Sequence, residues 1–264
     1  MDVILDQTLK AGMDHLEQGR VADALNILEA YYTSHTDSPD ACFCYGDALA
    51  EDGRVAEAVS VYRSGLKLQP DDADALTTLG DLLFETGHHT EAIDAYRRVL
   101  EIDPKDADAL VSIGLVYNSL ERGDDAIRAF HQALEMDPDN IFAWNAMGDT
   151  LYGRGDSQAA VDAYQKAIEI DPLDPASHFN LGDLLYDMEE LEDAEEECRE
   201  AIKLDPAFGM AYLTLGYICM DQDRTAEAVA FFEGYLKNER SQQADDMIAE
   251  VKAVIEGLKE ELKG

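Results

Sequence analysis

A period of 34 residues runs through almost the whole chain and limits the folds open to it. Its clearest mark is a set of five prolines spaced by this interval: Pro70, Pro104, Pro138, Pro172 and Pro206. In the same phase the sequence divides without insertion into seven repeats, 5–38, 39–72, 73–106, 107–140, 141–174, 175–208 and 209–242. A repeat this short cannot bury its apolar face alone, so the sequence predicts an array in which neighbouring repeats pack on one another.

Each repeat has the pattern of two helices joined by a tight turn. Position 8 is glycine and position 20 is alanine in all seven repeats, and apolar residues recur around them with helical spacing. A glycine inside a helix costs about 0.5–1 kcal/mol relative to alanine, so its recurrence predicts close approach of a neighbouring helix. Glycine near position 15 predicts the turn, and the fourth repeat has its glycine, Gly123, two residues later.

The boundaries of the helices follow from the same prolines. Proline cannot continue a helix, so it ends the second helix of a repeat. The residue before the next repeat is a favourable N-cap in five cases, Ser38, Asp72, Asp106, Asn140 and Asp174. Phe208 precedes the last repeat, whose first helix is therefore expected to start without a side-chain cap.

The order of these residues resembles the tetratricopeptide repeat, W-x2-L-G-x2-Y followed by A-x3-F and P. The fifth repeat matches it at Trp144, Met147, Gly148, Leu151, Ala160, Tyr164 and Pro172. The resemblance covers residues 5–242 and implies an all-α fold, a right-handed superhelical solenoid of antiparallel helix pairs. The terminal repeats lack the proline and have Thr36 and Arg240 in its place. An apolar stripe within residues 243–264 predicts a C-terminal capping helix: Met247, Ile248, Val251, Val254, Ile255, Leu258 and Leu262.

Charge excludes two classes of partner. Acidic residues outnumber basic ones by 57 to 20, which gives a formal net charge of −37. Such a chain repels phosphate backbones and anionic lipid headgroups, so neither nucleic acid nor a membrane is an expected partner. Acids stand near the N-terminus where a signal peptide needs bases, and no apolar stretch approaches the ~20 residues that span a bilayer. We therefore expect a soluble, cytoplasmic protein.

No motif predicts catalysis, and no cofactor or metal is expected. Cys42, Cys198 and Cys219 occupy packing positions and should be small buried hydrophobic residues, while His178 and His15 replace packing aromatics. No Gly-rich phosphate loop or nucleophile motif is present. The segment 187–200 carries nine acids, which we interpret as a solvated surface, with a docking patch for a basic partner as the alternative.

Positions 2, 5, 9 and 12 of the first helix share one face, apart from the packing stripe. In tetratricopeptide proteins this face lines the concave groove that holds peptides, and the resemblance implies the same here. Position 9 is aspartate in four repeats, Asp47, Asp81, Asp149 and Asp183, more than the composition predicts. Two interpretations stay open. The aspartates bind a ligand, or they replace the small polar residue that family members often have after the position-8 glycine, in a chain that is acidic throughout.

Aromatic and amide side chains accompany these aspartates: Phe43, Phe84, Asn145, Tyr152, Phe179, Asn180, Tyr186 and Tyr217. Our hypothesis is a non-enzymatic protein–protein interaction scaffold that binds a basic or aromatic peptide segment in an acidic groove. The alternative is a self-assembling scaffold, a homo-oligomer in which the groove accepts a terminal helix of the neighbouring protomer. A third interpretation makes the acidity an adaptation to high salt.

Overall fold

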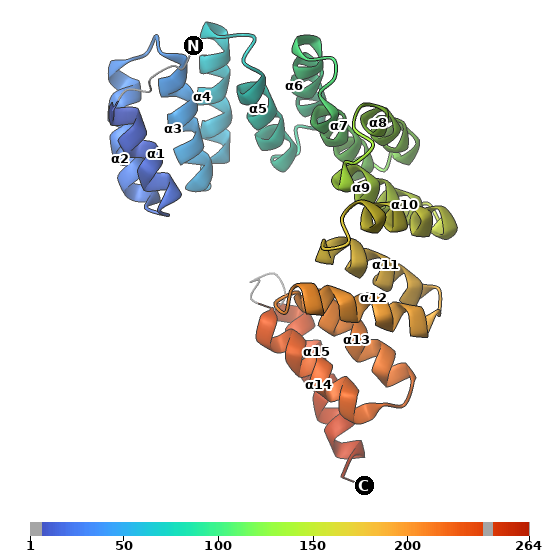
Figure 1. Ribbon diagram of the computed structural model, residues 1–264. Helices are drawn as coiled ribbons and strands as arrows, with labels where there is room; N and C mark the ends of the chain where they lie inside the picture. The colour runs from blue at the N-terminus through green and yellow to red at the C-terminus, as the bar shows by residue number, and fades with distance from the viewer. Residues whose placement is uncertain (1–6, 240–244, 264) are drawn as a thin grey trace. The chain divides into compact units, whose positions relative to one another are not determined.

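The computed structural model describes residues 7–239 and 245–263, and all regular secondary structure in these ranges is helical (Figure 1). The first helices of the repeats are α1 (Gln7–Glu17), α3 (Pro39–Glu51), α5 (Ala73–Glu85), α7 (Ala107–Ser119), α9 (Ile141–Gly153), α11 (Pro175–Asp187) and α13 (Gly209–Asp221). The second helices are α2 (Val21–Ser34), α4 (Val55–Leu68), α6 (His89–Ile102), α8 (Gly123–Met136), α10 (Ser157–Ile170), α12 (Leu191–Leu204) and α14 (Thr225–Asn238). A last helix, α15 (Asp245–Glu261), follows. The predicted all-α fold of paired helices is confirmed.

The helices form two compact units, α1–α8 and α9–α15. Within each unit the two helices of a repeat pack on each other, and the second helix packs on the first helix of the next repeat. In the C-terminal unit α9 also contacts α11, and α11 contacts α13, so successive first helices lie side by side. The face that these first helices share is where the sequence predicts a binding surface.

The position-8 glycines allow the two helices of each repeat to approach closely. A Cβ added at Gly148 would lie 2.4 Å from the ring of Tyr164, the position-24 residue of the same repeat. The same addition at Gly80 would lie 2.5 Å from the ring of Tyr96. The expectation that close helix contact explains these glycines is confirmed.

The turns between the paired helices need one residue with positive φ. Four repeats use glycine at position 15, with φ between 69° and 84°: Gly19, Gly53, Gly87 and Gly155. In the fourth repeat the left-handed residue is Glu121, with φ of 57°, and Gly123 is the first residue of α8. The expectation of a displaced turn glycine is therefore wrong. Packing of α7 on α8 fixes the length of the turn, so position 15 is left-handed there even without glycine.

The predicted N-caps are confirmed. The side chains of Ser38, Asp72, Asp106, Asn140 and Asp174 each accept a backbone N–H three residues along. Phe208 makes no side-chain cap bond. At position 4 the structure adds a contact that the sequence did not predict: Trp144 Nε1 donates to the carbonyl of Pro138 at 3.0 Å, and the Tyr212 hydroxyl donates to that of Pro206 at 3.2 Å. These bonds fasten the inter-repeat loop to the following helix.

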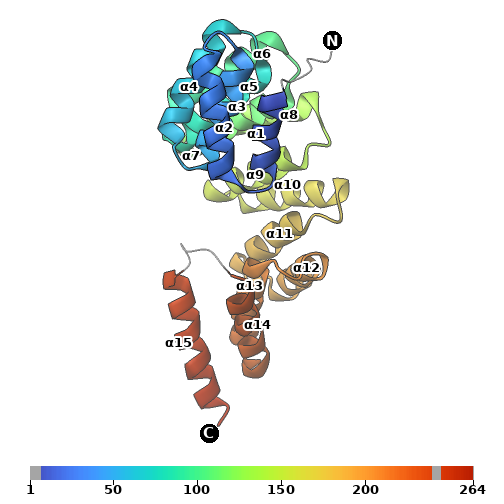
Figure 2. The same ribbon diagram turned by 90° about the vertical axis from the view of Figure 1, so that its left-hand side faces the viewer.

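Helix α15 packs along α14 (Figure 2). Val251, Ile255 and Leu258 are buried, and Lys259 pairs with Glu233 of α14 at 2.7 Å. Met247 and Leu262 of the predicted stripe are exposed. Residues 5–6 of the first repeat, Arg240 and residues 243–244 of the expected cap lie outside the described residues. No helix in the described ranges is both long and apolar enough to cross a membrane.

Candidate functional site

The predicted groove residues divide between the two compact units. Helices α3 and α5 of the N-terminal unit carry Phe43, Asp47, Asp81 and Phe84. Helices α9, α11 and α13 of the C-terminal unit carry Asn145, Asp149, Tyr152, Phe179, Asn180, Asp183, Tyr186 and Tyr217. The larger set therefore lies on three neighbouring helices of one unit.

Three of the four position-9 aspartates accept a hydrogen bond from a tyrosine hydroxyl of the same repeat. The tyrosine stands at position 24, fifteen residues further along and on the second helix. The pairs are Tyr62–Asp47, Tyr96–Asp81 (2.6 Å) and Tyr164–Asp149 (2.6 Å). These carboxylates thus have a structural partner inside the protein.

The residue at position 24 accounts for most of the pattern at position 9. Repeats with tyrosine at position 24 have aspartate at position 9, whereas repeats with Leu28, Phe130 or Phe232 there have Met13, Leu115 or Tyr217. The sixth repeat differs, because Cys198 occupies position 24. Its Asp183 accepts a bond from Thr214 of the next repeat instead, at 2.8 Å. These tyrosines were not among the predicted site residues, although the sequence itself contains the signal: in three repeats an aspartate is followed by a tyrosine fifteen residues later.

Burial sets the protonation behaviour of these pairs. It raises the pKa of Asp47, Asp149 and Asp183, and the hydrogen bond that each accepts acts in the opposite direction. Burial also raises the pKa of Tyr164, and the bond to Asp149 raises it further. In this pair the tyrosine hydroxyl is the donor and the aspartate the acceptor.

A second set of bonds links successive first helices in the C-terminal unit. The hydroxyl of Tyr152 on α9 donates to Asp187 of α11, and that of Tyr186 on α11 donates to Asp221 of α13 at 2.9 Å. Asn145 adds a bond from Nδ2 to Ser177 Oγ at 2.8 Å. The exposed carboxylates of Asp187 and Asp221 use one oxygen each in these bonds. We name the surface formed by α9, α11 and α13 the odd-helix face.

The remaining predicted residues are half-buried, and four of them contact neighbouring rings. Those ring contacts are Phe43 with Tyr62 (5.5 Å between centroids), Phe84 with His89 (5.7 Å), Phe179 with Phe208 (5.2 Å) and Tyr217 with Phe232 (5.2 Å). Asn180 is half-buried on α11. These aromatic side chains stabilise the packing of the repeats, and Tyr152 is the most exposed of the aromatics predicted for the groove.

The other residues singled out in the sequence occupy packing positions. All four cysteines are buried, and burial raises the pKa of Cys44 and of Cys198 to about 12, so both remain thiols. His178 is buried between Glu197, whose carboxylate lies 2.6 Å from Nδ1, and the carbonyl of Pro172, 3.1 Å from Nε2. The expectation that the position-4 histidine packs in the array is confirmed.

Family models cover nearly all of the repeat array. The tetratricopeptide repeat model matches residues 9–73, 46–107 and 179–245. A second tetratricopeptide repeat model matches residues 107–140, and a TPR repeat model matches residues 148–189. The chain belongs to the tetratricopeptide repeat family.

Solved structures agree with this assignment. The chain is 28% identical to MamA in a crystal structure, with a TM-score of 0.54, covering 61% of this chain and 94% of that one. A tetratricopeptide repeat protein from Parabacteroides merdae ATCC 43184 matches with a TM-score of 0.74 and 19% identity, over 94% of this chain and 97% of that chain. MamA 41-end from Desulfovibrio magneticus RS-1 matches at 25% identity with a TM-score of 0.57, over 64% and 97%. No curated protein matches the sequence. Membership of this family supports a role as a protein–protein interaction scaffold.

Proposed function

We propose that this tetratricopeptide protein is a scaffold that binds a basic segment of a partner protein on its first-helix surfaces, above all on the odd-helix face. The observation that carries the proposal is the row of carboxylates held there by tyrosine hydroxyls. Asp149 is fixed by Tyr164, Asp187 by Tyr152 and Asp221 by Tyr186. A carboxylate positioned in this way has little conformational freedom left to lose on binding, which favours affinity.

The odd-helix face holds no cation of its own to neutralise these acids. Helices α9, α11 and α13 contain neither lysine nor arginine, and the same is true of α3, α5 and α7. Each tyrosine bond uses one of the two carboxylate oxygens, and a carboxylate accepts more than one donor. Lysine or arginine side chains of a partner would therefore find acceptors, and the ring face of Tyr152 would offer a cation–π contact.

Asparagine substitutions test the charge without removing the acceptor of the tyrosine bond. We would compare the intact protein with a variant that removes four charges from the odd-helix face, Asp149→Asn/Asp183→Asn/Asp187→Asn/Asp221→Asn. A control variant loses the same number of charges at exposed positions of second helices and α15: Glu101→Gln, Glu135→Gln, Glu192→Gln and Glu256→Gln. Each protein is used for affinity capture from a lysate of the source organism at two salt concentrations.

The proposal expects a protein with a basic segment to be retained by the intact and control forms, and lost by the asparagine variant and at high salt. Equal retention by all three forms would refute binding through these aspartates. Recovery of the chain alone, with a mass that rises with concentration in light scattering, would instead favour the self-assembling scaffold.

A further inference from the structure

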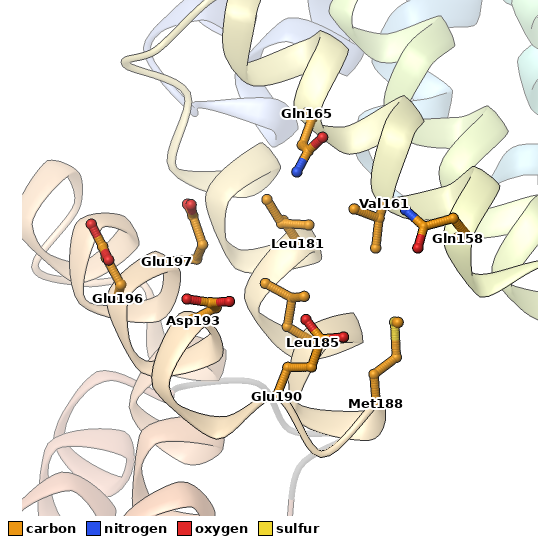
Figure 3. Close-up of a pocket in the computed structure, with 10 residues that line it drawn as sticks. All are labelled: Gln158, Val161, Gln165, Leu181, Leu185, Met188, Glu190, Asp193, Glu196 and Glu197. Carbon is orange, nitrogen blue, oxygen red and sulfur yellow. The ribbon is translucent and has the colours of Figure 1, made fainter.

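A recess lies between α10, α11 and α12 of the C-terminal unit, and none of the aspartates, tyrosines or asparagines named for the odd-helix face lines it. It has a volume of about 360 Å³ (Figure 3). We name it the α10–α12 recess and define it by an apolar floor of Val161, Leu181 and Leu185 and an acidic rim of Glu190, Asp193 and Glu196. The floor side chains are buried, whereas the rim carboxylates are exposed. In Figure 3 the two leucines of α11 lie between α10 and the carboxylates of α12.

Equivalent recesses in the N-terminal unit contain an arginine. Between the second and third repeats, Arg63 at position 25 pairs with Glu91 at position 19 of the following repeat, and both line the recess. Between the third and fourth repeats, the position-19 residue is Asp125, which accepts a bond from Arg122 at 2.7 Å and also pairs with Arg128. An arginine thus neutralises the position-19 acid in each case.

The α10–α12 recess lacks this arginine. Position 25 of the fifth repeat is Gln165, and position 19 of the sixth repeat is Asp193. Between the sixth and seventh repeats the arginine is present again: Arg199 at position 25 lies 3.7 Å from Glu227 at position 19. The acid at position 19 is thus present in the sixth repeat without the cation that accompanies it in the first, second, third, fourth and seventh repeats, while the fifth repeat has Ala159 there.

No residue in the described ranges compensates the rim by an ion pair. Glu190, Asp193 and Glu196 form none, although cations lie on the same helix. Arg199 is held by Glu195 and Glu227, and Lys203 by Glu200. Three carboxylates of like charge therefore stand beside an apolar floor and attract an external cation.

We infer that the α10–α12 recess is a second docking site, which takes a basic segment of a partner protein. A lysine or arginine of that segment pairs with Asp193, in the place that Arg63 occupies in the second repeat. A leucine-sized side chain next to it covers Leu181 and Leu185. Charge complementarity favours this occupant over a bound metal, because no three His, Cys, Asp or Glu side chains in the described ranges converge as metal ligands. A second copy of the chain is disfavoured by its net charge of −37.

The test uses a fluorescein-labelled peptide, Gly-Lys-Leu-Leu-Arg-Lys-Leu-Gly, and fluorescence anisotropy with the full chain. The variant Glu190→Gln/Asp193→Asn/Glu196→Gln removes the rim charges. The variant Glu101→Gln/Glu135→Gln/Glu192→Gln removes as many charges outside the recess, with Glu192 on the same helix as the rim. Gln165→Arg rebuilds the arginine of the other repeats without removing any acid.

Loss of the pair with Asp193 and of the attraction by the other two rim carboxylates should weaken binding of the peptide about tenfold in the rim variant, and less than about twofold in the control variant. Gln165→Arg should also weaken binding, because the new arginine occupies the place of the peptide's cation. A peptide with serine in place of leucine should bind less tightly than the original. Equal weakening by rim and control variants would overturn the proposal, as would unchanged binding by Gln165→Arg. Far-UV circular dichroism of every variant verifies the fold.

Discussion

Two glycines of helix α9 provide a sharp test of how these repeats pack. Gly148 at position 8 and Gly153 at the end of the helix stand on one helix, and neither has positive φ. A Cβ at Gly148 would meet three ring atoms of Tyr164 at 2.4, 2.8 and 2.8 Å, whereas a Cβ at Gly153 would meet nothing within 4 Å. The substitutions Gly148→Ala and Gly153→Ala are chemically identical, so their difference reports on packing alone.

The expected free energies follow from these contacts. Carbon atoms pack at about 3.5–4.0 Å, so the Gly148→Ala contact is more than 1 Å too short. The ring of Tyr164 is 3% exposed, and its hydroxyl is bonded to Asp149, which prevents an easy shift. Overpacking of about 1–3 kcal/mol and a weakened bond of about 1 kcal/mol exceed the gain in helix propensity of about 1 kcal/mol. Gly148→Ala should therefore lower the free energy of unfolding by about 1–3 kcal/mol, and Gly153→Ala should raise it by up to about 0.5 kcal/mol.

Urea unfolding followed by far-UV circular dichroism measures both variants. The chain has one tryptophan, Trp144, which lies on the same helix and gives a local fluorescence signal for α9. A Gly148→Ala protein as stable as the parent would refute the argument that tyrosine packing requires glycine at position 8. Equal destabilisation by both substitutions would refute it as well, since the effect would then be a general property of the helix.

Three further predictions concern the tyrosine–aspartate pairs and the last helix. Tyr164→Phe should cost about 1 kcal/mol in urea unfolding, and adding Asp149→Leu, which copies the apolar pair of the fourth repeat, should recover most of it; additive losses would contradict this. Burial raises the pKa of Asp47, Asp149 and Asp183 above the ordinary aspartate value of about 3.8. These carboxylates therefore take up protons at a higher pH in the folded protein than in the unfolded chain. Protonation stabilises the folded state increasingly as the pH falls through the folded-state pKa, and the gain is complete below the unfolded pKa of about 3.8. The melting temperature should rise between about pH 7 and about pH 4.5, and that of the variant Asp47→Asn/Asp149→Asn/Asp183→Asn should rise less; an equal rise would contradict this. Deletion of residues 245–264 should expose the apolar surface of α14, lower the melting temperature and increase light scattering, whereas an unchanged protein would show that α15 has no capping role.

The local features of the fold could be predicted because their causes lie within a few residues. Proline ends a helix, and Asp72 or Asn140 caps the next by bonding a backbone N–H three residues along. The period of 34 residues repeats these signals, so each repeat supports the interpretation of the others. Glu121, Glu189 and Asp223 were the exceptions, because their positive φ is imposed by the packing of two helices and not by their own preference.

The candidate site was predicted less completely, since its partners are remote in the sequence. Helical spacing alone places Asp149 and Asp183 on a common face. Spacing does not predict that Tyr164 donates to Asp149 or that Thr214 donates to Asp183. Each bond crosses to another helix, and which side chain it meets depends on how the helices pack.

The sequence by itself determined the repeat, the helix boundaries, the close contact at position 8 and the excess of negative charge. The tertiary structure alone decided which acids are neutralised within the protein and which face solvent. Arg63 reaches Glu91 in the next repeat, 28 residues away, while Asp193 at the equivalent position has no such cation. Charge is a property of composition, but its compensation requires two side chains to meet, and only the packing of neighbouring repeats brings them together.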